Sequence, residues 1–368
     1  MSSPVLGVPL AIGLFDQVEW EDRPASEVYD EHLALIEYAE AAGFYCYHLS
    51  EHHGSPLSLT PSPNLMLAAA SQRTRRIRLG SLVHTLTYYD PMRLAAEINM
   101  LDHLTHGRLE LGVGRGISAV EATFFDITSV EDSRAIYREN FDALLAALTA
   151  EHTLDFQGKY HSYADVPVWM HPVQRPYPPL WFPSANEDSI TFTASQGLNT
   201  VLNNYFTKEV TRSLVERYAE LFEEHRHDPN RLNAHVDTPK VGWSVKVVVA
   251  RTDKRAEATA RQAFATWEEH ITYLERRAGV PPRVERGDYE HHRANGSMLV
   301  GSPERVADEM SETIEGTGVN YLLCSLTFGN LPHADAMQSM ELFAEHVMPR
   351  FHEGADAPSQ HGTPKPAN

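Results

Sequence analysis

The sequence of 368 residues contains only two cysteines, Cys46 and Cys324, and each lies in an apolar run typical of a β-strand. Two cysteines in such positions support neither a disulfide framework nor a thiolate metal site, and they fit a reducing compartment. No basic segment followed by an apolar core opens the chain, and no apolar run approaches the roughly 18 residues that a membrane span requires. These absences predict a cytoplasmic protein.

Positive charge is also scarce, because 31 Lys and Arg residues stand against 50 Asp and Glu residues, for a formal net charge of -19. An acidic surface repels phosphate backbones and anionic lipids, so we expect neither nucleic acid nor a membrane surface as a partner. A hydrophobic fraction of 42% is ordinary for a folded protein. We expect a single domain over residues 1–351 and an unstructured, Gly- and Pro-rich tail over residues 352–368.

Short apolar runs rich in β-branched residues recur along the chain, with helical segments between them. Each run is a continuous apolar stretch rather than an in-out alternation, which indicates strands of a parallel sheet covered by helices. The clearest helix covers residues 91–107, where Leu94, Ile98 and Leu101 share one face. Eight strands are predicted, at residues 9–15, 44–50, 77–86, 109–113, 180–183, 200–203, 241–250 and 321–327.

Eight alternating strand and helix units favour an α/β fold of the (β/α)8 TIM-barrel type. The alternative is an open doubly wound sheet, but the glycine-rich fingerprint expected after its first strand is absent from residues 14–17. Insertions are predicted after strand 4, at residues 156–179, and after strand 7, at residues 276–297. The second insertion is either a lid over a pocket or a disordered segment.

Histidines gather where predicted strands end, and in a parallel barrel the carboxyl ends of the strands build the active site. His52 and His53 follow the second strand, and His84 ends the third. Because adjacent strand residues face opposite ways, only one of His52 and His53 should face the pocket. A histidine at this rim is either a catalytic acid or base or a structural hydrogen-bonding residue, and the sequence leaves both open.

Two further rim segments are candidates for holding an anion. Arg115, between Gly114 and Gly116 after the fourth strand, can grip a phosphate with its planar guanidinium, although the glycines also suit a tight turn. After the fifth strand, Asn186 and Ser189 open a predicted helix whose free amides can hold an anion. Ordinary capping of that helix by Asn186 is the alternative.

A metal hydrolase is a further alternative, since the chain has 20 histidines. Such enzymes commonly need two histidines spaced two apart on a strand, both facing inward. That spacing is found at His225 and His227, but they end a charged helix, which indicates a solvated helix terminus. We therefore predict no metal site.

Several motifs in combination resemble the bacterial luciferase-like flavin-dependent monooxygenases. Residues 50–53 read SEHH after the second strand, and residues 101–116 read LDHLTHGRLELGVGRG. Further similarity lies at Pro178-Pro179-Leu180, at residues 300–303 and at residues 318–320. The resemblance spans about residues 8–350.

The resemblance implies a barrel that binds reduced FMN at its carboxyl rim, supplied by a separate flavin reductase, and that oxygenates a small organic substrate through a flavin hydroperoxide. His52 matches the active-site histidine of the family. The matching cofactor-binding positions are Leu82 and Val83, whose peptide bond is cis in the family and lies under the flavin ring, Gly114, the phosphate-gripping Arg115, and Ala185, Asn186 and Ser189 at the phosphate. Helices over residues 62–73 and 91–107 match the subunit interface, which implies a homodimer.

Three positions depart from luciferase itself. Gly114 stands where luciferase has a cysteine, Ser118 where it has a tyrosine, and Asn204 where it has an active-site tryptophan. The departures argue against light emission and long-chain aldehyde specificity, but not against FMN binding. A deazaflavin-dependent oxidoreductase on the same scaffold and a non-catalytic flavin-binding protein remain as alternatives.

Overall fold

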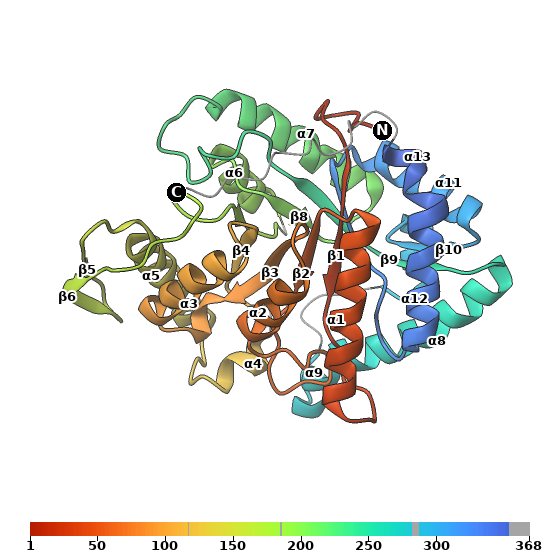
Figure 1. Ribbon diagram of the computed structural model, residues 1–368, viewed down its shortest axis with the longest axis horizontal. Coiled ribbons are helices and arrows are strands. Elements are labelled where there is room, and N and C mark those ends of the chain that lie inside the picture. Colours follow the sequence, from red (N-terminus) through yellow and green to blue (C-terminus); the bar gives the residue numbers. More distant parts are fainter. Residues whose placement is uncertain (117, 185, 282–286, 353–368) are drawn as a thin grey trace, which may run out of the picture.

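The computed structural model describes residues 1–116, 118–184, 186–281 and 287–352, with the side chain of His352 left out (Figure 1). Parallel strands lie at the centre and helices surround them. Of the predicted tail, residues 352–368, only residue 352 belongs to the described part, and residues 353–368 lie outside it. The predicted TIM-barrel fold is confirmed.

Eight parallel strands of the described chain form the barrel, in the order β1-β2-β3-β4-β7-β8-β9-β11. Isolated parallel bridges, Trp181 to Asn199 and Ser184 to Leu202, join β7 to β8, and β11 pairs with β1. The pairing therefore returns to its starting strand. The strands are β1 (Ala11–Asp16), β2 (Cys46–Leu49), β3 (Arg78–Thr85), β4 (Leu109–Gly114), β7 (Leu180–Trp181), β8 (Thr200–Leu202), β9 (Val241–Val249) and β11 (Tyr321–Ser325).

Helices connect these strands and cover the outside of the barrel. Proline opens several of them, as its fixed φ allows at a first helical position. Ser302, the residue before Pro303 at the start of one of these helices, makes no side-chain capping hydrogen bond. The helices are α1 (Ala25–Ala42), α2 (Pro63–Arg73), the short 3-10 turn η1 (Leu86–Tyr88), α3 (Pro91–Leu104), α4 (Ala119–Thr123), α5 (Val130–Thr149), α6 (Glu187–Ser195), α7 (Lys208–His225), α8 (Asp253–Ile271), α11 (Pro303–Thr317), α12 (His333–Leu342), the π-helical turn η2 (Phe343–Val347) and α13 (Pro349–His352).

The insertion predicted after strand 4 is ordered, and it contains an antiparallel hairpin of β5 (Thr153–Gln157) and β6 (Ser162–Pro167) that projects from the body of the molecule (Figure 1). The insertion after strand 7 contains α9 (Tyr273–Ala278) and α10 (Tyr289–Asn295), while residues 282–286 lie outside the described part. It ends in β10 (Met298–Gly301), which pairs with the last residues of β9. Neither the hairpin nor β10 was predicted, because their residues lack the continuous apolar runs or length of the barrel strands.

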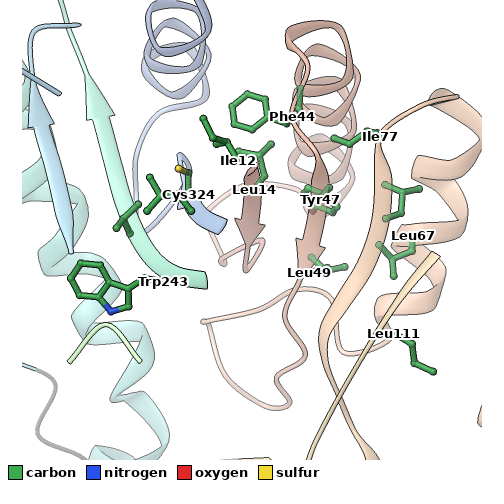
Figure 2. Close-up of a cluster of buried hydrophobic side chains, with 14 of the residues drawn as sticks. Ile12, Leu14, Phe44, Tyr47, Leu49, Leu67, Ile77, Leu111, Trp243 and Cys324 are labelled. Atoms are coloured by element: carbon green, nitrogen blue, oxygen red, sulfur yellow. The ribbon is translucent and has the colours of Figure 1, made fainter. Parts of the chain in front are cut away.

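The main core lies between the strands and the helices. Ile12 and Leu14 of β1 point to this outer layer together with Phe44, whose ring stacks on Phe343 of η2 (Figure 2). Alternate residues face the barrel interior, and Trp181 and Tyr321 fill part of it below the cavity.

A close approach inside the barrel requires glycine at residue 13. A Cβ on Gly13 would lie 1.7 Å from the Tyr321 hydroxyl, so no larger residue fits beside that ring. The Tyr321 hydroxyl in turn contacts His48 Nε2 at 2.9 Å. Because large side chains fill this part of the interior, the space for a ligand lies at the carboxyl end of the barrel.

Candidate active site

A cavity of about 430 Å3 opens at the carboxyl end of the barrel. A volume of this size is ordinary for a site that binds a small molecule or cofactor. Every barrel strand or the loop after it contributes to the walls. Its lining includes Phe15, Gln17, Ser50, Glu51, His52, Leu82, Val83, Thr85, Val113, Gly114, Arg115, Glu121, Phe182, Asn186, Ser189, Leu202, Asn203, Asn204, Tyr205, Ser244, Lys246, Trp267, Leu323 and Ser325.

His52 lines the cavity, and its Nδ1 lies 2.9 Å from Oε1 of Glu121 on α4. An ionised carboxylate can only accept, so this contact places the proton of a neutral His52 ring on Nδ1. Nε2 is then the ring nitrogen that can accept a proton. The two residues form a hydrogen-bonded histidine–carboxylate dyad at the cavity wall.

His53 does not line the cavity, so only one of the two histidines does, as predicted. The reason differs from the predicted strand alternation, because β2 ends at Leu49 and residues 50–53 follow it in a loop. Its Nε2 lies 2.8 Å from Oε1 of Glu51, and its ring packs edge-on against Tyr88 and Phe125. The other oxygen of Glu51 accepts hydrogen bonds from Thr85 N and from the Tyr89 hydroxyl. His53 therefore has a structural role.

His84 is fully buried and does not line the cavity, so the rim position expected from sequence is wrong for its side chain. Nδ1 contacts Ser81 Oγ at 2.5 Å, and Nε2 contacts Asn64 Oδ1 at 2.7 Å. Burial lowers the pKa of His84, although Glu51 opposes the shift. The residue ties β3 to α2.

Arg115 also lines the cavity, and its Nη1 donates a hydrogen bond to Ser133 Oγ on α5 at 3.3 Å. The glycines beside it have steric reasons of their own. A Cβ on Gly114 would lie 2.6 Å from Val83 Cγ2, and Gly116 has φ of +82°. The turn explanation for the glycines therefore holds, and it leaves the arginine at the mouth of a cavity.

Asn186 and Ser189 line the same cavity at the start of α6. They form a capping box, in which the Asn186 side chain accepts from Ser189 N at 2.9 Å and the Ser189 hydroxyl accepts from Asn186 N at 3.1 Å. Ordinary capping is thus present beside the cavity. Ala185, the third residue predicted in this loop, lies outside the described residues.

Leu82 and Val83 line the cavity on β3, and the peptide bond between them is cis. The pairing of β3 with β4 shifts register between Ser81 and His84, around these two residues. Nearby, Ser50 Oγ is buried without a hydrogen-bond partner among the described residues. A ligand in this cavity would find an available hydroxyl there.

Several lining residues were missed by sequence reasoning. Glu121 lies 69 positions from His52 in the sequence, so only the three-dimensional structure shows that the two side chains are partners. Lys246 was hidden in an apolar strand, where it stands between Val245 and Val247 of β9. Trp267, from α8, carried no strand-end signal at all.

The departures from luciferase fall at or beside this site. Gly114 and Asn204 line the cavity, where smaller or polar side chains replace a cysteine and a tryptophan. Ser118 caps α4 by accepting a hydrogen bond from Glu121 N at 3.2 Å. The departures therefore alter the shape of the cavity and the support of the dyad.

Neither a metal cluster nor a membrane helix was found in the part of the chain that the structure describes. No group of three or more His, Cys, Asp or Glu side chains there could hold a metal ion. His225 is the last residue of α7, and His227 is exposed just beyond it. No described helix is long and apolar enough to cross a membrane.

Comparison with known sequences identifies relatives over most of the chain. A family model described as luciferase-like monooxygenase matches residues 11–321. The chain is 32% identical over 350 residues to the uncharacterised protein y4wF of Sinorhizobium fredii, covering 94% of this chain and 98% of that protein. It is 26% identical over 340 residues to limonene 1,2-monooxygenase of Rhodococcus erythropolis, covering 90% and 83%.

Solved structures share the fold at lower identity. Monooxygenase RslO1 of Streptomyces bottropensis has a TM-score of 0.82 and 24% identity, covering 93% of this chain and 100% of its own. The oxygenating constituent of 3,6-diketocamphane monooxygenase of Pseudomonas putida, in complex with FMN, has a TM-score of 0.77 and 22% identity, covering 93% and 99%. An F420-dependent secondary alcohol dehydrogenase has a TM-score of 0.70 and 16% identity, with the same coverage.

Proposed function

Since the chain belongs to the luciferase-like monooxygenase family of flavin-dependent enzymes, we propose that it binds reduced FMN in the cavity and transfers one oxygen atom of O2 to a small organic substrate. The observation that carries the proposal is the convergence of Arg115, the start of α6 and the His52–Glu121 dyad on one cavity. The diketocamphane enzyme, which shares the fold, was solved with FMN, and this supports the choice of cofactor.

The residues present fit this cofactor. Arg115 and the capped start of α6, at Asn186 and Ser189, would hold the phosphate, because a guanidinium and helix amides both favour an anion. Leu82 and Val83 would lie beside the ring system. The Ser50 hydroxyl, which has no hydrogen-bond partner within the described chain, offers the ring a hydrogen bond. Gly114 lines the same cavity with its backbone.

Reduced FMN, when bound, supplies the electrons that activate dioxygen. The protein contributes the proton transfers and the exclusion of water. His52 Nε2 accepts or returns a proton, while Glu121 holds the ring by Nδ1 and stabilises its protonated form. Apolar walls that include Phe15, Phe182 and Trp267 exclude water from the site, so that the activated oxygen reacts with the substrate and not with water.

We also propose that a separate reductase supplies the reduced flavin. The diketocamphane relative by fold is described as the oxygenating constituent of its monooxygenase, which supports a division of labour of this kind. In such a system the oxygenase needs to bind only the flavin, oxygen and the organic substrate.

The proposed subunit arrangement is a homodimer formed through α2 and α3. These neighbouring helices expose Leu65 at 74% and Met100 at 55%, and the segment after β6 exposes Trp169 at 93%. Large apolar side chains exposed on neighbouring elements commonly mark an interface between proteins. These side chains therefore support the dimer that the family resemblance implies.

The experiment that tests the cofactor is an anaerobic titration of the purified protein with reduced FMN and, separately, with the reduced deazaflavin F420. We expect saturable binding of reduced FMN, followed on admission of oxygen by a reaction rate that differs from that of free reduced FMN. Binding of the deazaflavin alone would overturn the proposal in favour of hydride transfer without oxygen. Binding of FMN with an unchanged oxygen reaction would indicate a non-catalytic flavin-binding protein.

The same experiment on His52→Ala separates binding from chemistry. His52 is proposed to transfer a proton and not to bind the phosphate. The variant should therefore bind reduced FMN almost as the wild type does and react with oxygen at a changed rate. Glu121→Gln should change the rate in the same direction. His346→Ala, with a half-exposed side chain on η2, is the control and should change neither quantity.

A further inference from the structure

Lys246 is a buried cation at the cavity wall. Residues 242, 244 and 246 of β9 share the face that points into the barrel, and Ser244 and Lys246 both line the cavity. Lys246 is only 7% exposed, and its Nζ lies 3.5 Å from the centroid of the Trp267 ring. Lysine is almost never this deeply buried unless its charge is paired with another group.

Among the residues that the structure describes, no carboxylate forms an ion pair with Lys246. The acid that acts on it most is Glu19, and the oxygens of that carboxylate are already engaged. Oε1 accepts from Gly329 N at 2.6 Å, and Oε2 lies 2.6 Å from His270 Nδ1. Burial lowers the pKa of the Lys246 ammonium to about 7, with Glu19 opposing the shift. The described part of the protein thus desolvates this cation without supplying a direct counter-charge.

Further hydrogen-bond donors lie along the same wall. Gln17 Oε1 accepts from Trp267 Nε1 at 3.1 Å, so the amide group of Gln17 is oriented with its NH2 left as a donor. Ser325 of β11 is the register partner of Lys246, and in a parallel sheet such partners point the same way. Gln17, Lys246 and Ser325 all line the cavity and together present donors to it.

This wall lies across the barrel from the proposed phosphate site. Arg115 follows β4 and Ser189 follows β7, while Lys246 and Ser325 lie on β9 and β11 and Gln17 follows β1. In the circular strand order these two sets are on different sides of the mouth. A cofactor held at β4 and β7 therefore leaves the Lys246 wall for another ligand.

We propose that Lys246, Gln17 and Ser325 form the subsite for the substrate, and that the substrate is a small, otherwise apolar organic molecule bearing an anionic oxygen, either a carboxylate or an ionised phenol or enol. This inference rests on the proposed function, since it assigns the substrate side of the same cavity. The anionic oxygen accepts hydrogen bonds from the Lys246 ammonium and the Gln17 amide. The apolar body packs on Trp267, Phe15 and Leu323.

The test compares benzoate with its neutral analogue benzyl alcohol at pH 6, by isothermal titration of wild type and Lys246→Met. Wild type should bind benzoate roughly ten- to hundredfold more tightly than benzyl alcohol, the effect of one hydrogen bond to a charged group. Lys246→Met should lose that preference. Absence of a preference in wild type, absence of benzoate binding, or a preference that survives in Lys246→Met would each overturn the inference.

A second pair of measurements separates this subsite from the cofactor site. Arg115→Ala should keep the preference for benzoate, because Arg115 belongs to the proposed phosphate site. If Arg115→Ala loses the preference and Lys246→Met retains it, benzoate binds at the phosphate site and the inference is contradicted. Lys246→Met should bind reduced FMN as wild type does. Failure of wild type to bind reduced FMN would instead refute the proposed function, whatever benzoate does. Thermal unfolding checks folding, and Lys246→Met should melt no lower than wild type because it removes an unpaired buried cation.

Discussion

His52 and His53 are adjacent in the sequence and have the same side chain, yet their surroundings give them different roles. His52 meets a carboxylate at the wall of a cavity, while His53 meets Glu51 among aromatic rings. Both residues lie in the loop after β2, which ends at Leu49, so the path of that loop and the groups packed on each ring cause the difference. At the scale of single residues, contacts decide role more than residue type does.

Arg115→Ala should weaken the binding of reduced FMN by about 1.5–3 kcal/mol, as expected for loss of a hydrogen bond between charged groups. Anaerobic fluorescence titration measures the dissociation constant. Arg138→Ala on α5 removes an exposed arginine of the same charge and should leave binding unchanged. A similar loss of affinity in His52→Ala would show that the division between phosphate binding and proton transfer is mistaken.

Asp16 and His32 form a buried pair that predicts a pH dependence of stability. His32 Nδ1 lies 2.6 Å from Asp16 Oδ2, and the Tyr47 hydroxyl donates to the same oxygen. Burial opposes ionisation of both groups, but their attraction prevails, so the pKa of Asp16 is lowered from 3.8 and that of His32 is raised from 6.5. The contribution of His32 is complete below pH 6.5 and is lost as the pH rises through its folded pKa. That of Asp16 is complete above pH 3.8 and is lost as the pH falls through its own.

His32→Gln should therefore lower the free energy of unfolding by about 3 kcal/mol near pH 5, since a buried charge loses its partner. The deficit should shrink as the pH rises above 6.5, because wild-type His32 then loses its proton. Urea unfolding at pH 5, 7 and 9 measures both effects. A deficit that does not vary with pH would show that packing, and not the ion pair, is what His32 provides.

At the scale of elements, short polar contacts fix the parts that the barrel itself does not hold. The β5–β6 hairpin projects from the body, and the carboxylate of Glu139 on α5 accepts hydrogen bonds from three successive backbone amides at its turn. The donors are Lys159 N, Tyr160 N and His161 N, at 2.6, 2.6 and 2.7 Å. One side chain thus anchors an element that buries little apolar surface.

Glu139→Ala should loosen that turn without unfolding the barrel. We expect amide hydrogen exchange at residues 159–161 to rise roughly tenfold or more, as loss of hydrogen bonds to a charged acceptor implies. Peptide-resolved exchange with mass spectrometry measures it. Glu151→Ala, at an exposed glutamate beyond α5, is the control. Unchanged protection of the turn in Glu139→Ala would show that the strand pairing alone holds the hairpin.

At the scale of the whole molecule, the strong negative charge and the exposed apolar side chains of α2 and α3 both bear on the proposed dimer. The charge of -19 disfavours random association, so a dimer needs a specific apolar interface to form. Leu65, Met100 and Trp169 supply exposed apolar side chains for it. Dimerisation would cover these side chains and leave the cavity mouth, on other elements, accessible.

Leu65→Glu combined with Met100→Glu should convert the proposed dimer into monomers, because two charges would be buried unpaired at the interface. Size-exclusion chromatography with light scattering gives the mass directly. Val210→Glu, at a half-exposed valine on α7, should leave the mass unchanged. A wild-type protein that is monomeric at micromolar concentration would refute the proposed arrangement.

Much of the fold was predictable because it depends on local pattern. The eight barrel strands are continuous apolar runs, and their bounds agree with the structure to within a few residues. The β5–β6 hairpin and β10 were missed because they are half-exposed or short, so no hydrophobic periodicity marks them. A long strand with a buried face leaves a hydrophobic pattern in the sequence. The exposed hairpin has no such pattern, and β10, although buried, is too short at four residues to show one.

The sequence by itself determined that strand ends carrying His52, Arg115 and Asn186 would meet at one rim, because parallel strands bring their carboxyl ends to one side of a barrel. Only the tertiary structure decided that Glu121 orients His52, that His84 is buried against α2, and that Lys246 faces the cavity beside Trp267. These contacts join residues far apart in the chain. Their geometry follows from packing between elements, which no local pattern of residues specifies.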